Sequence, residues 1–98
     1  MDLHVLPQRR PEIAWRVIEG EAIVVNPLAG LAYPFNPVAT RCWELADGRS
    51  TVSEIASVIA EEFDVPFEQA AQDVEGFISE LHQKNMIELQ SQTIQQGA

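Results

Sequence analysis

The chain has few of the features on which secreted and membrane proteins depend. It has one cysteine, Cys42, in 98 residues, so an intramolecular disulfide is excluded and nothing indicates an oxidising compartment. No apolar run approaches the roughly 20 residues of a membrane span. Residues 1–10 also lack the apolar segment of a signal peptide. We therefore expect a soluble, cytoplasmic protein of one domain, with enough apolar residues for a single core.

Residue patterns that support catalysis or metal binding are also scarce. A catalytic thiol needs a neighbouring base, and neither His4 nor His82 is near Cys42 in the sequence. The place of Cys42 beside Trp43, on an apolar helical face, favours a small core residue instead. The histidines have no second cysteine or close carboxylate pair, and no glycine-rich phosphate loop occurs. The sequence therefore predicts no active site, no cofactor and no metal.

Strand-forming residues are present in the first third of the chain. Turn residues divide three short segments that are rich in β-branched or aromatic residues: 13–18, 21–26 and 31–35. Glu19-Gly20 is a plausible hairpin turn between the first two segments. We expect three antiparallel strands in meander order. In the third strand, Leu31, Tyr33 and Phe35 share the core face. Pro34 has no ladder donor, which favours an edge strand.

Helical patterns follow, each with apolar residues at 3.6-residue spacing, over residues 37–46, 52–63 and 67–84. Asn36 can cap the first helix, and Pro37 suits the first helical position. Gly48 can take the left-handed conformation that ends a helix, and Thr51 with Glu54 has the spacing of a capping box. The expected fold is α+β and winged helix-turn-helix-like, a three-stranded antiparallel β meander followed by three α-helices.

The ends of the chain lack such patterns. Residues 1–10 are expected to form a flexible arm, and residues 90–98 a polar, disordered tail. The domain then covers residues 11–89, in which residues 86–89 can add a short strand.

A winged helix raises the question of DNA binding. The helix that enters the major groove needs cationic side chains for the phosphates. Before its one cation, Lys84, the third predicted helix has only acids among its charged residues: Glu68, Asp73, Glu75 and Glu80. Fifteen acidic residues against six basic ones give a net charge of −9, which would repel a polyanion. A winged-helix DNA-binding regulator is therefore the weaker alternative.

The predicted edge strand offers a different kind of site. An unpaired edge can accept an extended peptide as a further strand through main-chain hydrogen bonds. If the third helix lies alongside, the two elements form a groove for the side chains of the peptide. Gly76 costs roughly 1 kcal/mol relative to alanine inside a helix, and it could let another backbone approach. An ordinary edge, blunted by Pro34, is the alternative interpretation.

The order of several short motifs leads to a known family. The motifs are Tyr33-Pro34-Phe35-Asn36, Ala39, Cys42-Trp43, the run from Asp47 to Ala56, Phe63-Asp64-Val65, the run from Asp73 to Leu81, and Met86-Ile87. In this order and spacing they resemble the PqqD family, small peptide chaperones that are also called RiPP recognition elements. RiPPs are ribosomally synthesised, post-translationally modified peptides. The resemblance extends from about Pro11 to Leu89.

This resemblance implies a protein without enzymatic activity that binds the leader segment of a precursor peptide as an added strand. It also implies a partner, a modifying enzyme such as a radical S-adenosylmethionine protein, and leaves open whether the product is the quinone cofactor PQQ, a lasso peptide or another modified peptide. The implied peptide-binding residues of the strand are Leu31, Ala32, Tyr33, Pro34 and Phe35. Those of the helix are Ala70, Asp73, Val74, Phe77, Glu80 and Leu81. Asp73 and Glu80 would then favour a leader with a basic residue.

Overall fold

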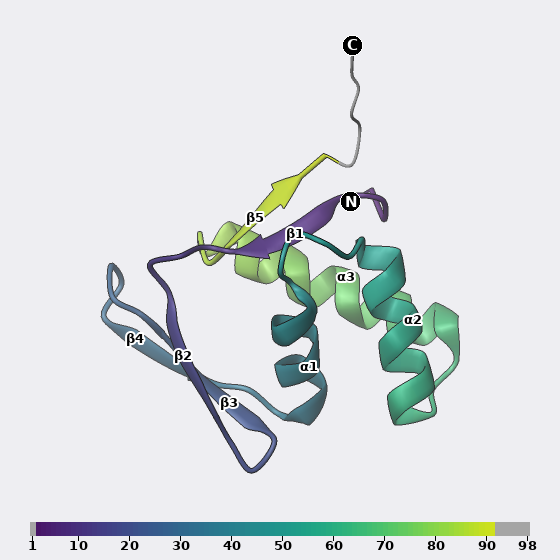
Figure 1. The fold of residues 1–98 in the computed structure, drawn as a ribbon, viewed down its shortest axis with the longest axis horizontal. Coiled ribbons are helices and arrows are strands. Elements are labelled where there is room, and N and C mark those ends of the chain that lie inside the picture. The colour runs from purple at the N-terminus through teal and green to yellow at the C-terminus, as the bar shows by residue number, and fades with distance from the viewer. Residues whose placement is uncertain (1, 92–98) are drawn as a thin grey trace.

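The computed structural model describes residues 2–91, which form five strands and three helices (Figure 1). In chain order the elements are β1 (Leu6–Arg9), β2 (Ala14–Ile18), β3 (Glu21–Asn26), β4 (Leu31–Pro34), α1 (Pro37–Leu45), α2 (Val52–Phe63), α3 (Phe67–Gln83) and β5 (Ile87–Gln90). Both sheets are antiparallel. The fold is therefore α+β, as predicted, but it has five strands in two sheets, where a three-stranded meander was expected with a possible short strand over residues 86–89.

The larger sheet is the predicted meander, with strand order β2-β3-β4. The hairpin between β2 and β3 turns at Glu19 and Gly20, whose φ angles are 53° and 81°. A tight turn with two positive φ angles matches the twist of the strands that it joins, and glycine takes this conformation without strain. In β3 the burial alternates: Ala22 and Val24 are buried and Ile23 is exposed. One face of this sheet therefore packs on the helices, and the other does not.

The smaller sheet pairs the two ends of the described chain. β1 and β5 are antiparallel, with Leu6 opposite Gln90. The predicted flexible arm over residues 1–10 is therefore wrong for residues 6–9. The N–H of Arg9 donates to the carbonyl of Ala46 at 2.8 Å, and the guanidinium of Arg9 donates to the carbonyls of Trp43 and Glu44. The predicted tail over residues 90–98 lies outside the described residues, except for residues 90 and 91.

The three helices have the predicted starts, and those of α1 and α2 are fixed by local capping contacts. Asn36 Oδ1 accepts a hydrogen bond from the N–H of Ala39 at 2.8 Å. Thr51 and Glu54 form the reciprocal capping box, with distances of 3.0 and 2.8 Å. The ends of α1 and α3 come one residue earlier than predicted. Gly48 has φ +81°, a left-handed conformation that favours glycine, and a Cβ there would lie 3.0 Å from Oε1 of Gln8.

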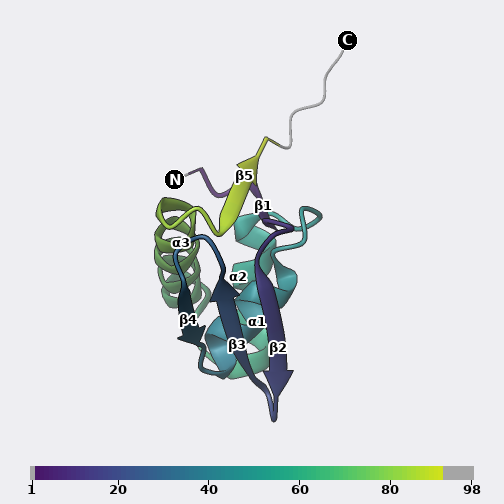
Figure 2. The same cartoon turned by 90° about the vertical axis from the view of Figure 1, so that its left-hand side faces the viewer.

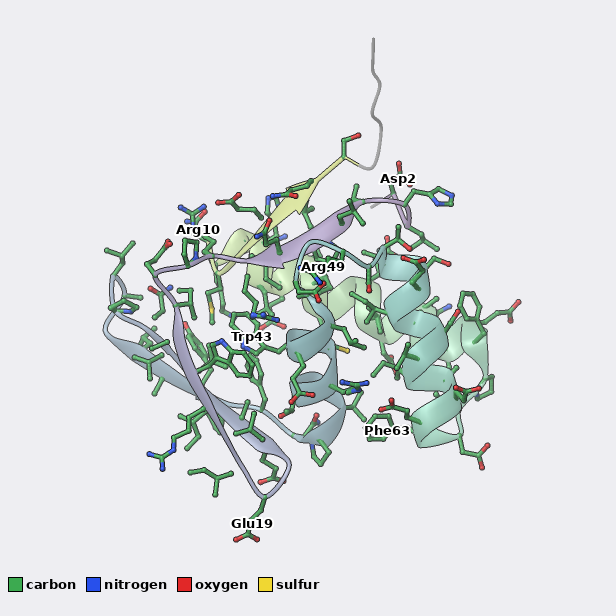
Figure 3. All side chains as sticks on the ribbon, in the orientation of Figure 1. Asp2, Arg10, Glu19, Trp43, Arg49 and Phe63 are labelled. Carbon is green, nitrogen blue, oxygen red and sulfur yellow. The ribbon has the colours of Figure 1, made fainter. Side chains whose placement is uncertain are left out.

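The core lies between the inner face of the larger sheet and the three helices. Trp43, which has no exposed surface, projects from α1 toward the sheet (Figure 3), and its ring meets that of Phe35 edge-on at 5.8 Å. Ile55, Ile59 and Ile78 join α2 and α3 in the same cluster. Gly76 faces open space, so no described backbone approaches α3 there. Within residues 2–91 no helix is both long and apolar enough to cross a membrane.

Candidate functional site

Both edge strands of the larger sheet, β2 and β4, have an unpaired edge in the described part of the chain. Of the two, β4 has α3 beside its free edge (Figure 2). Two contacts join the elements. The ammonium group of Lys84, which directly follows α3, lies 5.6 Å from the centre of the Tyr33 ring. The ring of Phe77 on α3 meets that of Phe35 edge-on at 5.2 Å. These side chains line the space between β4 and α3, which we call the β4–α3 groove.

The hydrogen-bond pattern of β4 decides what its free edge offers. The N–H of Phe35 donates to the carbonyl of Ala22 at 2.8 Å. Residue pairs in an antiparallel ladder alternate between hydrogen-bonded and non-hydrogen-bonded. The Tyr33–Val24 pair is therefore also hydrogen-bonded, while Ala32 and Pro34 direct their backbone groups away from β3. Proline has no N–H. The free edge thus offers two acceptors, the carbonyls of Ala32 and Pro34, and one donor, the N–H of Ala32.

A pocket of about 320 Å³ lies where α3 meets the start of α1. It is lined by Asn36, Val38, Ala39, Cys42, Asp73, Val74 and Phe77. The last three were implied by the resemblance as peptide-binding residues. The first four were not expected at a site, although the helical spacing of Ala39 and Cys42 had placed both on the apolar face of the first helix. Only the packing of α1 against α3 shows that part of this face borders a pocket.

The residues implied by the family resemblance come together around the β4–α3 groove, but they differ in exposure. On β4 and the residue after it, Leu31, Ala32 and Pro34 are exposed, Tyr33 is half-buried, and Phe35 is buried. On α3, Asp73 and Glu80 are exposed and Phe77 is half-buried. The remaining three, Ala70, Val74 and Leu81, are buried in the core. Ala70 and Leu81 therefore support the groove from behind, and Val74 reaches only the wall of the pocket.

The two acidic residues of the groove differ in whether a neighbouring cation balances their charge. Glu80 accepts a hydrogen bond from Lys84 Nζ at 2.7 Å, and this contact raises the pKa of Lys84. Asp73 accepts only from the neutral amide of Gln69, at 2.9 Å, among the residues described. The charge of Glu80 is thus already balanced, whereas the carboxylate of Asp73 at the pocket still lacks a cation.

The thiol of Cys42, which lines the pocket, is a poor nucleophile in the folded protein. Burial raises the pKa of Cys42 to about 12, so the nucleophilic thiolate is absent near neutral pH. This agrees with the prediction that Cys42 is a core residue. Among residues 2–91, no three side chains of the metal-binding types gather where they could hold an ion. The arrangement is suited to binding an extended chain by its backbone and by an apolar side chain.

Solved structures of known function have the same fold. TbiB1, in complex with the TbiA(beta) leader peptide, matches with a TM-score of 0.75 and 21% identity, covering 83% of this chain and 94% of TbiB1. The PqqD truncation of Methylobacterium extorquens PqqCD, a stand-alone RiPP recognition element, matches with a TM-score of 0.69 and 24% identity, covering 86% and 88% of the two chains. The fold is therefore that of RiPP recognition elements.

Sequence comparison identifies the family. Residues 21–87 match the family model of coenzyme PQQ synthesis protein D (PqqD). The PqqA binding protein of Rhizobium meliloti (strain 1021) is 31% identical over 72 residues, which are 74% of this chain and 71% of that protein. The chain belongs to the PqqD family, as its motifs indicated.

Proposed function

We propose that this protein is a non-catalytic adaptor that binds the leader segment of a ribosomally synthesised precursor peptide and presents it to a modifying enzyme. The observation that carries the proposal is the free edge of β4 beside α3, with the backbone groups of Ala32 and Pro34 directed away from β3. Relatives support it, because TbiB1 binds a leader peptide and the Rhizobium protein is named for binding PqqA.

The leader adds to β4 as a fourth strand of the larger sheet. Its backbone hydrogen-bonds to Ala32 and to the carbonyl of Pro34, which gives affinity that tolerates different sequences. Alternate side chains of the leader turn into the β4–α3 groove, where Leu31, Tyr33 and Phe77 offer apolar and aromatic contacts. The pocket next to Phe77 accepts one apolar side chain. The uncompensated carboxylate of Asp73 favours a basic residue beside it, more than Glu80 does.

We base the finer assignments of the fold, the cellular compartment and the pathway on membership of the PqqD family. We assign β2–β4 and α1–α3 to a winged-helix arrangement that takes a peptide in place of DNA, because the exposed side of α3 carries acidic residues such as Glu68 and Asp73. The single cysteine is in keeping with a cytoplasmic setting. The modifying enzyme is assigned as a radical S-adenosylmethionine protein, and the pathway as that of PQQ or of a related modified peptide.

A titration of the isotope-labelled protein tests this function. Synthetic PqqA and the TbiA(beta) leader serve as probes, and a scrambled peptide of the same composition serves as the control for each. We expect a true leader to shift the backbone amide signals of Ala32, Tyr33 and Phe77, and the scrambled peptide to leave them in place. Leader binding that moves only signals of α2, or equal shifts with the scrambled peptides, would refute strand addition to β4.

A further inference from the structure

The larger sheet has a second face that the groove does not use. We call it the outer face and define it by Ala14, Arg16 and Ile18 of β2, Glu21, Ile23 and Val25 of β3, and Ala32 and Pro34 of β4. The strand register places these residues side by side, with Arg16 opposite Ile23, Val25 opposite Ala32, and Ile23 opposite Pro34. Figure 2 shows the sheet from this side, with α1 and α2 behind it. No described element covers this face.

The outer face is unusually apolar for a surface open to water. Ile18, Ile23 and Val25 are 50%, 44% and 39% exposed, and they adjoin one another on two strands. Two shallow hollows, of about 370 and 340 Å³, share Ile18 and Ile23 in their lining. An antiparallel sheet of this kind would ordinarily carry mostly polar residues on its solvent side, whereas Arg16 and Glu21 are the charged residues of this face and the others are apolar. A contiguous exposed apolar patch of this kind marks an interaction surface.

The charge of Arg16, on the β2 side of the outer face, limits what can cover it. Four of the six cations have partners: Arg9 binds backbone carbonyls, and Arg10, Arg41 and Lys84 pair with carboxylates. Within residues 2–91 the side chain of Arg16 has no hydrogen bond or ion pair, although this chain carries a net charge of −9. A partner that buries the face must supply a carboxylate for Arg16 amid apolar residues, because a buried unpaired cation is costly.

We propose that the outer face is the docking surface for the modifying enzyme, which meets it with an apolar patch that contains an acidic residue. The proposal rests on the proposed function. A leader strand added to β4 lies next to Ala32 and Pro34, so its outward side chains extend the outer face by one strand. Ala32 and Pro34 are small and leave those side chains accessible. An enzyme seated on this face touches the adaptor and the bound leader together.

A second copy of this chain fits the face less well. A two-fold dimer would bury this face of each copy against the same face of the other. Two chains of charge −9 repel each other.

Charge reversal on the outer face tests the proposal in the full chain. The probe is a purified radical S-adenosylmethionine enzyme of PQQ synthesis, immobilised, with the adaptor in solution. The variants are Arg16→Glu and Ile23→Glu, and the matched control is Arg49→Glu. Arg49 also has no side-chain partner among the described residues, and it lies in the connection between α1 and α2, away from the sheet (Figure 3). Binding of the leader is measured in parallel for every variant, and thermal unfolding verifies that each folds.

We expect both outer-face variants to weaken enzyme binding at least about tenfold, with leader binding within about twofold of the native chain and the control unchanged. Unchanged enzyme binding in both variants, with leader binding intact, would overturn the docking surface alone. Sedimentation that shows a native dimer, lost in the same variants while enzyme binding persists, would assign the face to self-association and overturn it too. Failure of the native chain to bind any leader would instead refute the proposed function.

Discussion

Replacing Ala32 with proline removes a single backbone N–H and so tests whether the backbone of β4 binds the leader. Ala32 supplies the one N–H donor that β4 directs to its free edge, since Pro34, the other residue facing that way, has none. The substitution leaves the bonds between β3 and β4 in place, because Ala32 and Val25 form a non-hydrogen-bonded pair. It therefore removes a hydrogen bond from the complex and none from the free protein.

The size of the effect follows from that count. A backbone hydrogen bond contributes a net of about 1 kcal/mol, which corresponds to a roughly fivefold rise in Kd. The proline ring also projects toward the incoming strand, so fivefold is the lower expectation. Ala32→Val is the matched control, because valine keeps the N–H and suits a strand. We expect it to leave Kd within about twofold of the native value, since its side chain points to the outer face.

The assay is fluorescence anisotropy with a labelled leader, together with thermal melts of both variants. An Ala32→Pro protein that folds normally and binds the leader as tightly as the Ala32→Val protein would refute strand addition at this edge. Equal weakening in the two variants would also contradict the reasoning, because it would trace the effect to the side chain.

Two further predictions concern the groove and its pocket. Phe77→Ala should weaken leader binding and lower the free energy of unfolding by about 2 kcal/mol, because the half-buried ring packs against Phe35. The control is Phe67→Ala, which removes an exposed aromatic ring from the same helix and should change neither quantity when both are measured by calorimetry. Equal losses in the two variants would contradict this assignment. The Cys42 thiol should resist a thiol reagent at pH 8 in the folded protein and react on unfolding, since burial raises its pKa to about 12. The unfolded thiol ionises near 9, so stability should fall as the pH rises from about 9 toward 12, and rapid labelling of the folded protein would refute this.

Local chemistry made much of the fold predictable. The hairpin at Glu19-Gly20, the cap at Asn36 and the capping box at Thr51 each depend on residues within three positions of one another, so the sequence alone placed β2, β3, β4 and the helix starts. The predicted edge strand beside the third helix suggested the candidate groove, and the family resemblance named its residues but not their exposure. Ala70 and Leu81 were included with the peptide-binding residues, and both are core residues.

Contacts between distant segments were decided only by the tertiary structure. β1 pairs with β5 across most of the chain, so nothing near Leu6 could indicate a strand. The pocket needs α1 packed on α3. Whether the backbone of Pro34 faces β3 or the free edge depends on the register between β4 and β3. Ile23 and Val24 are similar in sequence terms, yet one is exposed and the other buried, because the sheet packs on helices with one face only.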